Sequence, residues 1–80
     1  ESLQHNIQIY PNPVWHELHL KMPSTETNVQ VIVYTILGKA VMEAKVFQST
    51  TINMSSLANG VYLLKINTQK ETITKKIIKK

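Results

Sequence analysis

The sequence predicts an all-β protein, an antiparallel sandwich of seven short strands. Apolar residues recur with a period of two rather than 3.6, and turn-forming residues interrupt the pattern roughly every 8 to 12 residues. The chain has 80 residues, of which 42% are hydrophobic and 18% charged, so it is apolar enough to fold and short enough for one small core. We therefore expect a single domain over residues 1–80, with residues 1–6 as the end of a linker.

Two alternating segments open the chain, with a break between them. Residues 7–10 alternate briefly and stop at Pro11-Asn12-Pro13, where two rings fix φ and remove two main-chain donors. In residues 14–22 the even positions are apolar except His16, which predicts a strand with one buried face. We expect the chain to turn at the prolines, with His16 partly buried and His19 on the surface.

The middle of the chain predicts a hairpin. Residues 29–36 are β-branched almost throughout and apolar on both faces, which is typical of a central strand. Leu37-Gly38-Lys39 follows as a turn, since Gly38 tolerates a positive φ. Residues 40–47 alternate again and return the chain as the second strand.

The last third of the chain predicts three more strands. They cover residues 51–54, 61–67 and 72–79, separated by a compact loop and a turn. We expect Leu57 in that loop to enter the core. The predicted core consists of Leu18, Leu20, Val31, Val33, Met42, Leu57, Leu64, Ile66 and Ile77.

The formal net charge of +4 lies wholly in the last eleven residues. Residues 1–69 contain four Lys and four Glu, whereas residues 70–80 contain five Lys and one Glu. Alternation along the final strand divides its lysines between two faces, Lys75 and Lys79 with Ile73 and Ile77, and Lys76 and Lys80 with Ile78. The tail is therefore not a uniform basic face.

Composition argues against catalysis and against nucleic-acid binding. The chain has no Cys and no Asp, and its serines fall in predicted turns or loops, with no strand-to-helix turn to present a nucleophile. His16 and His19 point to opposite faces of the predicted strand, so they cannot chelate one metal ion. The absence of Arg and the small number of aromatic residues remove base contacts and a stacking platform. We expect no enzyme, no cofactor and no nucleic-acid partner.

Four segments occur in a characteristic order and spacing. They are Tyr10-Pro11-Asn12-Pro13, residues 31–39 ending in Leu37-Gly38-Lys39, residues 57–66 with Gly60-Val61-Tyr62, and Lys75-Lys76-Ile77-Ile78-Lys79-Lys80. Together they resemble the C-terminal sorting domain of proteins exported by the type IX secretion system of Bacteroidetes, over residues 7–80. No single segment is specific for this family, but the four segments in this order are.

The resemblance implies an immunoglobulin-like sandwich at the C-terminus of a large secreted protein. The chain begins at Glu1 rather than Met, so we expect it to be a piece of a longer protein, and the resemblance implies that a cargo lies upstream. The domain would be non-catalytic and would act as an address, read by the outer-membrane type IX translocon and its shuttle components. A gingipain-like sortase would cleave near or before Glu1 and attach the cargo to an anionic lipopolysaccharide. The parent protein would pass through the periplasm and reach the cell surface or the medium.

The resemblance also assigns recognition residues, each of which has a purely structural interpretation that stays open. They are Pro11, Asn12, Pro13, Gly38, Lys39, Gly60, Tyr62, Lys75, Lys76, Lys79 and Lys80. The prolines can protect an edge strand, the glycines can serve turns, and the Tyr62 ring can lie near the core with its hydroxyl bonded at the rim. The lysines can keep an edge strand soluble or contact the secretion machinery. Many members of the family carry Asp at the position of Thr35. The sequence therefore leaves open how the turn is capped in this chain.

The alternative function is that of an accessory binding module. A fibronectin-like sandwich on a secreted enzyme would hold carbohydrate or another protein. Carbohydrate modules display several coplanar exposed aromatic rings, and in this sequence Trp15 is the one good candidate.

Overall fold

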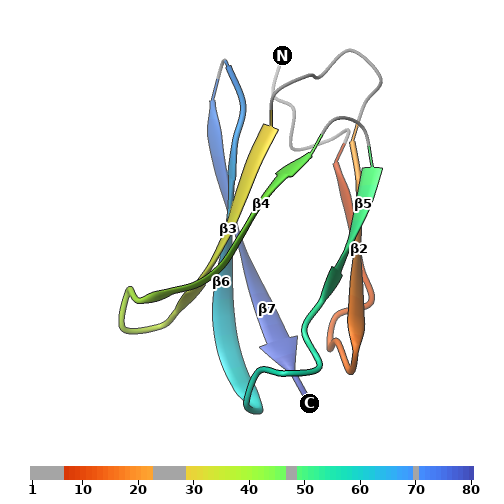
Figure 1. Cartoon of the computed structure of the whole chain (residues 1–80), viewed down its shortest axis with the longest axis vertical. Helices are drawn as coiled ribbons and strands as arrows, with labels where there is room; N and C mark the ends of the chain where they lie inside the picture. The colour runs from red at the N-terminus through yellow and green to blue at the C-terminus, as the bar shows by residue number, and fades with distance from the viewer. Residues whose placement is uncertain (1–6, 23–28, 47–48, 70) are drawn as a thin grey trace.

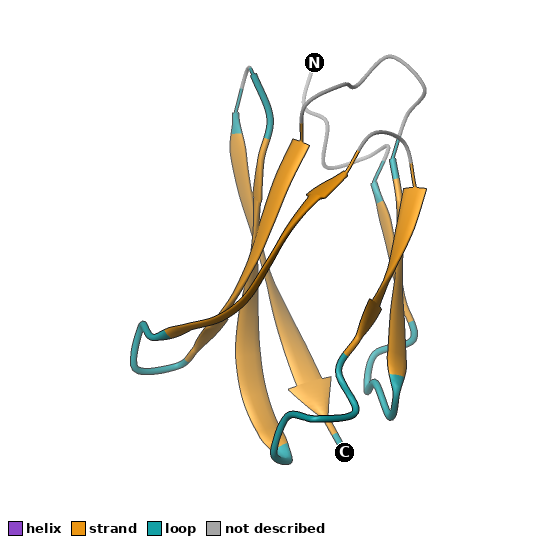
Figure 2. Ribbon diagram, viewed as in Figure 1, coloured by secondary structure: helices purple, strands orange, loops and turns teal. Residues whose placement is uncertain are grey.

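Seven antiparallel strands in two sheets form the protein, as defined by a computed structural model that describes residues 7–22, 29–46, 49–69 and 71–80 (Figure 1). The strands are β1 (Gln8–Tyr10), β2 (Glu17–Lys21), β3 (Val29–Thr35), β4 (Ala40–Val46), β5 (Ser49–Asn53), β6 (Gly60–Asn67) and β7 (Thr72–Lys79). One sheet has the order β1-β2-β5 and the other β4-β3-β6-β7. Within these residues no segment is helical (Figure 2), so no helix there could cross a membrane. The all-β prediction is confirmed.

The four-stranded sheet follows the sequence prediction closely. β3 lies between β4 and β6, which confirms it as a central strand. Its side chains alternate, with Val29, Val31 and Val33 buried and the residues between them partly exposed. β3 and β4 form the predicted hairpin, and β7 covers the predicted residues. Val31 and Val33 of the predicted core therefore lie on the buried face, whereas a segment apolar on both faces did not predict the partly exposed one.

The segment after the prolines differs from the prediction, which placed one strand over residues 14–22. β2 begins only at Glu17, and Val14 instead forms an isolated parallel bridge with Lys79 of β7. The two residues between them bend, and His16 is exposed, so its predicted partial burial is wrong. The physical reason is that the chain leaves one sheet and joins the other at this point. His19 in β2 is partly exposed.

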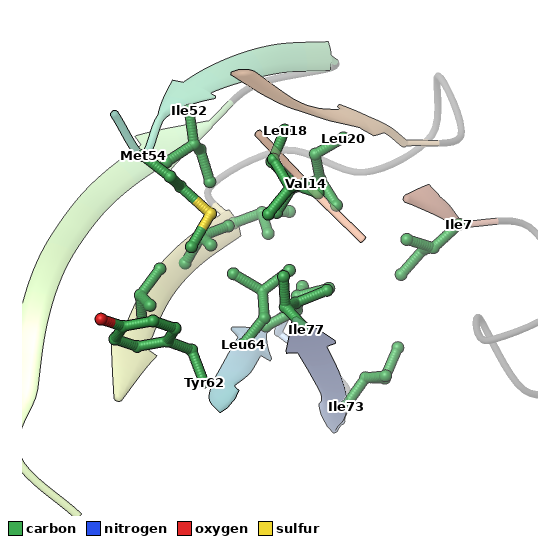
Figure 3. Packing of buried hydrophobic residues seen from close by; sticks show 14 of the residues in the cluster. Ile7, Val14, Leu18, Leu20, Ile52, Met54, Tyr62, Leu64, Ile73 and Ile77 are labelled. Carbon is green, nitrogen blue, oxygen red and sulfur yellow. The ribbon is translucent and has the colours of Figure 1, made fainter. Parts of the chain in front are cut away.

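The core lies between the two sheets (Figure 3). Leu18, Leu20 and Met54 face Leu64 and Ile77 across the sandwich, and all five are almost fully buried. Seven of the nine predicted core residues are buried, and the rest of the buried set comprises Ile7, Val14, Met22, Val29, Ile52, Met54, Tyr62 and Ile73.

Two predicted core residues lie at its margin. Met42 and Leu57 are only partly buried, although both pack against the core. Met42 belongs to β4, which ends its sheet and has a strand neighbour on one side only. Leu57 lies in the loop that connects the two sheets between β5 and β6. The rest of the protein covers each of these two side chains on one side only. The alternation of apolar residues in the sequence does not reveal this.

We predict that Leu64→Ala lowers the free energy of unfolding by about 2 to 5 kcal/mol, because a fully buried side chain leaves a cavity that the sheets cannot close. Urea unfolding would measure the change. Leu63→Ala is the matched control, because the Leu63 side chain is next to Leu64 in the chain but points outward. Its truncation should lower the free energy of unfolding by about 1 kcal/mol or less. Equal losses for the two variants would contradict the buried face assigned to β6.

Candidate functional site

The Asn12 side chain joins the first segment of the chain to the last. Its Nδ2 donates to the main-chain oxygen of Lys76 at 3.1 Å, and its Oδ1 accepts from the main-chain nitrogen of Ile78 at 3.1 Å. The bonded residues are 64 and 66 positions apart in the sequence. An amide side chain offers one donor and one acceptor group, so Asn12 pairs with the edge of β7 as a strand would.

Val14 continues this pairing with main-chain bonds. Its nitrogen donates to the oxygen of Ile78 at 2.8 Å, and its oxygen accepts from the nitrogen of Lys80 at 2.8 Å. Asn12 and Val14 with Lys76, Ile78 and Lys80 are here called the terminal junction. The junction covers the outer edge of β7 where the sheet would otherwise end with unpaired groups.

The prolines on either side of Asn12 fit this arrangement. Pro11 and Pro13 are exposed, and each is preceded by a cis peptide bond. Proline has no main-chain donor, so neither residue leaves an N–H group unpaired beside β7. The sequence predicted the turn but not its partner, because the pattern of residues 7–22 contains no sign of which strand Asn12 would meet.

The lysines of the last strand are divided as alternation predicted. Lys79 is only 6% exposed, and its Nζ donates to the main-chain oxygen of Lys80 at 3.0 Å. Lys75 is partly buried on the same face, whereas Lys76 and Lys80 are exposed on the other. Long lysine stems can cover apolar surface while the ammonium group finds a polar partner. The inward pair therefore stabilises the end of the sandwich, and the outward pair is free to face a partner.

The hairpin turn between β3 and β4 is capped by Thr35. Its Oγ1 accepts from the nitrogen of Lys39 at 3.2 Å, while its main-chain oxygen accepts from Gly38 at 2.9 Å. Gly38 has a φ of 92°, a conformation that favours glycine. The threonine hydroxyl thus takes the acceptor position that an aspartate carboxylate would occupy. The turn therefore remains capped although this chain has Thr35 where many members of the family carry Asp.

Gly60 and Tyr62 lie at the start of β6. Gly60 also has positive φ, at 152°. The Tyr62 ring is buried, and its hydroxyl donates to the main-chain oxygen of Ala58 at 2.6 Å. This confirms a near-core aromatic residue with a bonded hydroxyl at the rim.

The register of the four-stranded sheet places the sequence motifs side by side. Thr35 at the hairpin lies opposite Tyr62, and Tyr62 lies opposite Ile77 in β7. Gly60 lies opposite Lys79, which the terminal junction connects to the first segment. Four segments separated in the sequence therefore form one continuous region of a single sheet.

The described residues provide no set of ligands for a metal ion. They contain no group of three or more His, Asp or Glu side chains placed to hold one. Every buried side-chain nitrogen or oxygen among them has a hydrogen-bond partner.

Exposed aromatic residues bear on the alternative of a carbohydrate module. Trp15 is 62% exposed, beside the terminal junction. Tyr10 is exposed on the other sheet, where its ring is inclined by 41° to the ring of His19, with 5.3 Å between centroids. The Tyr10 and His19 rings are therefore not coplanar, whereas a flat stacking platform requires coplanar rings.

The fold and the joined motifs define a small two-sheet module whose first and last segments form one structural unit. The model of the family described as the secretion system C-terminal sorting domain matches residues 8–80. The chain belongs to this family and carries a C-terminal sorting signal of the type IX secretion system. A comparison with curated proteins found no match.

Membership has direct consequences for partners and location. A type IX sorting signal implies interaction with the type IX machinery and export of its protein to the cell surface or the medium. Domains of this family are generally non-catalytic. The resemblance recognised from the four segments is confirmed.

We predict that Asn12→Asp lowers the free energy of unfolding by about 0.5 to 1.5 kcal/mol, because the nearly isosteric carboxylate cannot donate to the oxygen of Lys76. Urea unfolding would measure the loss, and amide hydrogen exchange at Ile78 and Lys80 should accelerate. Asn59→Asp, at an exposed loop position, is the control and should stay within about 0.5 kcal/mol of the parent. Unchanged exchange at both amides would contradict a junction held by Asn12.

We predict that Thr35→Val costs about 0.5 to 1.5 kcal/mol, because it removes the acceptor for the nitrogen of Lys39 while keeping the shape of the side chain. Thr35→Asp restores an acceptor and should retain the parent stability. Thermal unfolding of the three chains would rank them. A valine variant as stable as the aspartate variant would show that the hydroxyl does not cap the turn.

Proposed function

We propose that this chain is a non-catalytic signal that directs a cargo protein through the type IX system across the outer membrane. The signal acts as a folded domain. The translocon and its shuttle components read the surface of the four-stranded sheet. A gingipain-like sortase then removes the domain and anchors the cargo at the cell surface. Residues 1–80 act as one domain, and residues 1–6, which lie outside the described residues, connect it to the cargo.

The terminal junction is the observation that carries this proposal. The Pro-Asn-Pro segment and the lysine-rich strand are bonded to each other through Asn12 and Val14. A receptor that recognises a linear peptide would need neither bond, whereas a receptor that recognises a folded surface needs both segments held in place. This supports recognition of the assembled domain.

The strand order supports an immunoglobulin-like assignment. Three strands in the order β1-β2-β5 face four in the order β4-β3-β6-β7, a division typical of such sandwiches. The first segment also contributes to both sheets, through β1 in one and Val14 in the other. We propose that the domain is an immunoglobulin-like sandwich on these grounds.

The residues assigned from the resemblance have different roles in this proposal. Asn12, Gly38, Gly60 and Tyr62 hold the recognised surface in shape through the bonds and backbone conformations described above. Lys39 and the outward lysines Lys76 and Lys80 are exposed and available to a partner. Lys75 and Lys79 face the sandwich and stabilise its end, with Pro11 and Pro13 flanking the junction.

An export assay tests the proposal. A periplasm-directed reporter fused upstream of residues 1–80 is expressed in a bacterium with a type IX system, and the reporter outside the cell is measured. We expect export of the intact fusion and strong loss on deletion of Lys79 and Lys80, which removes the bond between Lys80 and Val14. Retention of the intact fusion in the periplasm would refute the assignment, and equal export of the truncated fusion would refute the role of the last strand.

A further inference from the structure

The outward face of β3, β6 and β7 carries an apolar patch. Its members are Ile32, Tyr34, Val61, Leu63 and Ile78, none of which belongs to the buried core. Val61 is 39% exposed and Ile78 37%, and the other three are partly exposed. These five residues are here called the apolar patch.

The register makes this patch continuous. Tyr34 lies opposite Leu63 on neighbouring strands, and Val61 lies opposite Ile78. Ile32 and Tyr34 are two positions apart on β3, as Val61 and Leu63 are on β6, so each pair shares one face. The patch therefore crosses three adjacent strands without a break.

The outward face of the other sheet is different. It presents Gln8, Tyr10, Glu17, His19, Lys21, Thr51 and Asn53 on β1, β2 and β5, and Tyr10 is its one large apolar ring. A sheet face in contact with water normally carries polar side chains in alternation with buried apolar ones. The three-stranded sheet follows that rule, and the four-stranded sheet departs from it at the five positions of the apolar patch. Contiguous exposed apolar surface of this kind marks an interaction site.

Lysines border the patch on one side. Lys76 lies opposite Leu63, and Lys65 lies opposite Ile32 with its Nζ 6.0 Å from the centre of the Tyr34 ring. On the β4 side, Glu43 lies opposite Ile32 and accepts a hydrogen bond from Gln30 at 2.7 Å. The patch thus has a basic border along β6 and β7.

The hairpin extends the apolar surface outward. Ile36 follows Tyr34 by two positions, and Leu37 at the turn is 92% exposed. In Figure 1 the turn between β3 and β4 projects beyond the rest of the sheet, on the side away from the three-stranded sheet. An open hollow of about 370 Å³ lies beside the patch, lined by Ile32 and Tyr34 of β3 and by residues 40–43 of β4. The exposed apolar side chains of the turn lie next to this end of the patch.

We propose that the apolar patch and its basic border bind a protein of the secretion machinery that presents an apolar strip flanked by carboxylates. This rests on the proposed function and states which face of the signal is recognised. Charge complementarity selects the occupant, since Lys65 and Lys76 would lie beside the strip while the patch excludes water from it. A membrane surface is less suited, because anionic lipids are bound by clusters of four or more basic residues, about twice the number on this border.

Charge reversal on the two sheets tests the proposal. Lys76→Glu alters the border of the patch, and Lys21→Glu makes the same change on the outward face of the other sheet, where the side chain is equally exposed. Both are placed in the reporter fusion, and the thermal unfolding of each purified chain is compared with the parent. We expect Lys76→Glu to lower export about tenfold, since a like charge would face the partner carboxylate, and Lys21→Glu to leave export within about twofold.

A third variant addresses the apolar contact. Leu63→Thr introduces a β-branched residue suited to a strand and removes apolar surface from the centre of the patch. We expect export to fall several-fold while the unfolding temperature stays close to that of Leu63→Ala.

Several outcomes would overturn the inference. Equal export of Lys76→Glu and Lys21→Glu, with the intact fusion exported, would remove the patch as the recognised face while leaving the proposed function intact. Export lost only in Lys21→Glu would transfer recognition to the three-stranded sheet. Flotation of the purified chain with vesicles containing phosphatidylglycerol, abolished by Lys76→Glu, would replace the protein partner with a lipid surface. Failure of the intact fusion to leave the cell would instead refute the proposed function.

Discussion

The hydrogen bonds between the Asn12 side chain and the main chain of β7 are the constraint on which the arrangement of this domain depends. They connect residues from opposite ends of the sequence and place a short segment along the edge of the last strand. With Asn12 and Val14 in position, the end of β7 has partners on both sides, β6 on one and the first segment on the other. A strand paired on both sides keeps its register, so its lysines are held on defined faces.

This constraint explains why the lysine-rich strand is more than a solvated edge. A free edge strand needs exposed charges to prevent pairing with another chain. Here the edge is already paired at residues 76–80, and one lysine, Lys79, is buried with its ammonium group bonded to a main-chain oxygen. Lys76 and Lys80 remain exposed on the opposite face. The strand therefore has one set of lysines packed inward and one set accessible to solvent.

The four-stranded sheet brings segments that are distant in the sequence together on one surface. The hairpin turn, the Gly60 to Tyr62 segment and the last strand are distant in the chain but are neighbours through the register that pairs Thr35 with Tyr62 and Tyr62 with Ile77. A receptor that contacts this sheet reads all of them at once. A domain that is unfolded or truncated presents none of them together.

Much of the fold could be predicted from local pattern. Alternation located the buried sides of β6 and β7, β-branched residues located β3, and the positive φ of Gly38 and the hydroxyl bond of Tyr62 agree with the residue types present. The errors over residues 14–22 share one origin. The apolar positions 14 to 22 are all suited to burial, but Val14 is buried beside β7 while Leu18 is buried in the three-stranded sheet, and His16 lies exposed where the chain crosses. Alternation indicates that a side chain is buried, not which sheet buries it.

What the sequence by itself determined is the all-β class, the hairpin, the inward face of each main strand and the division of the terminal lysines, because each depends on residues within one segment. Only the tertiary structure decided that Asn12 bonds to β7, that Met42 and Leu57 lie at the margin of the core, and that Val61 and Ile78 meet on an open face. The reason is physical. A side-chain amide can pair with the edge of any strand, since all strands expose the same main-chain groups. Only the packing of the two sheets brings one particular edge within its reach.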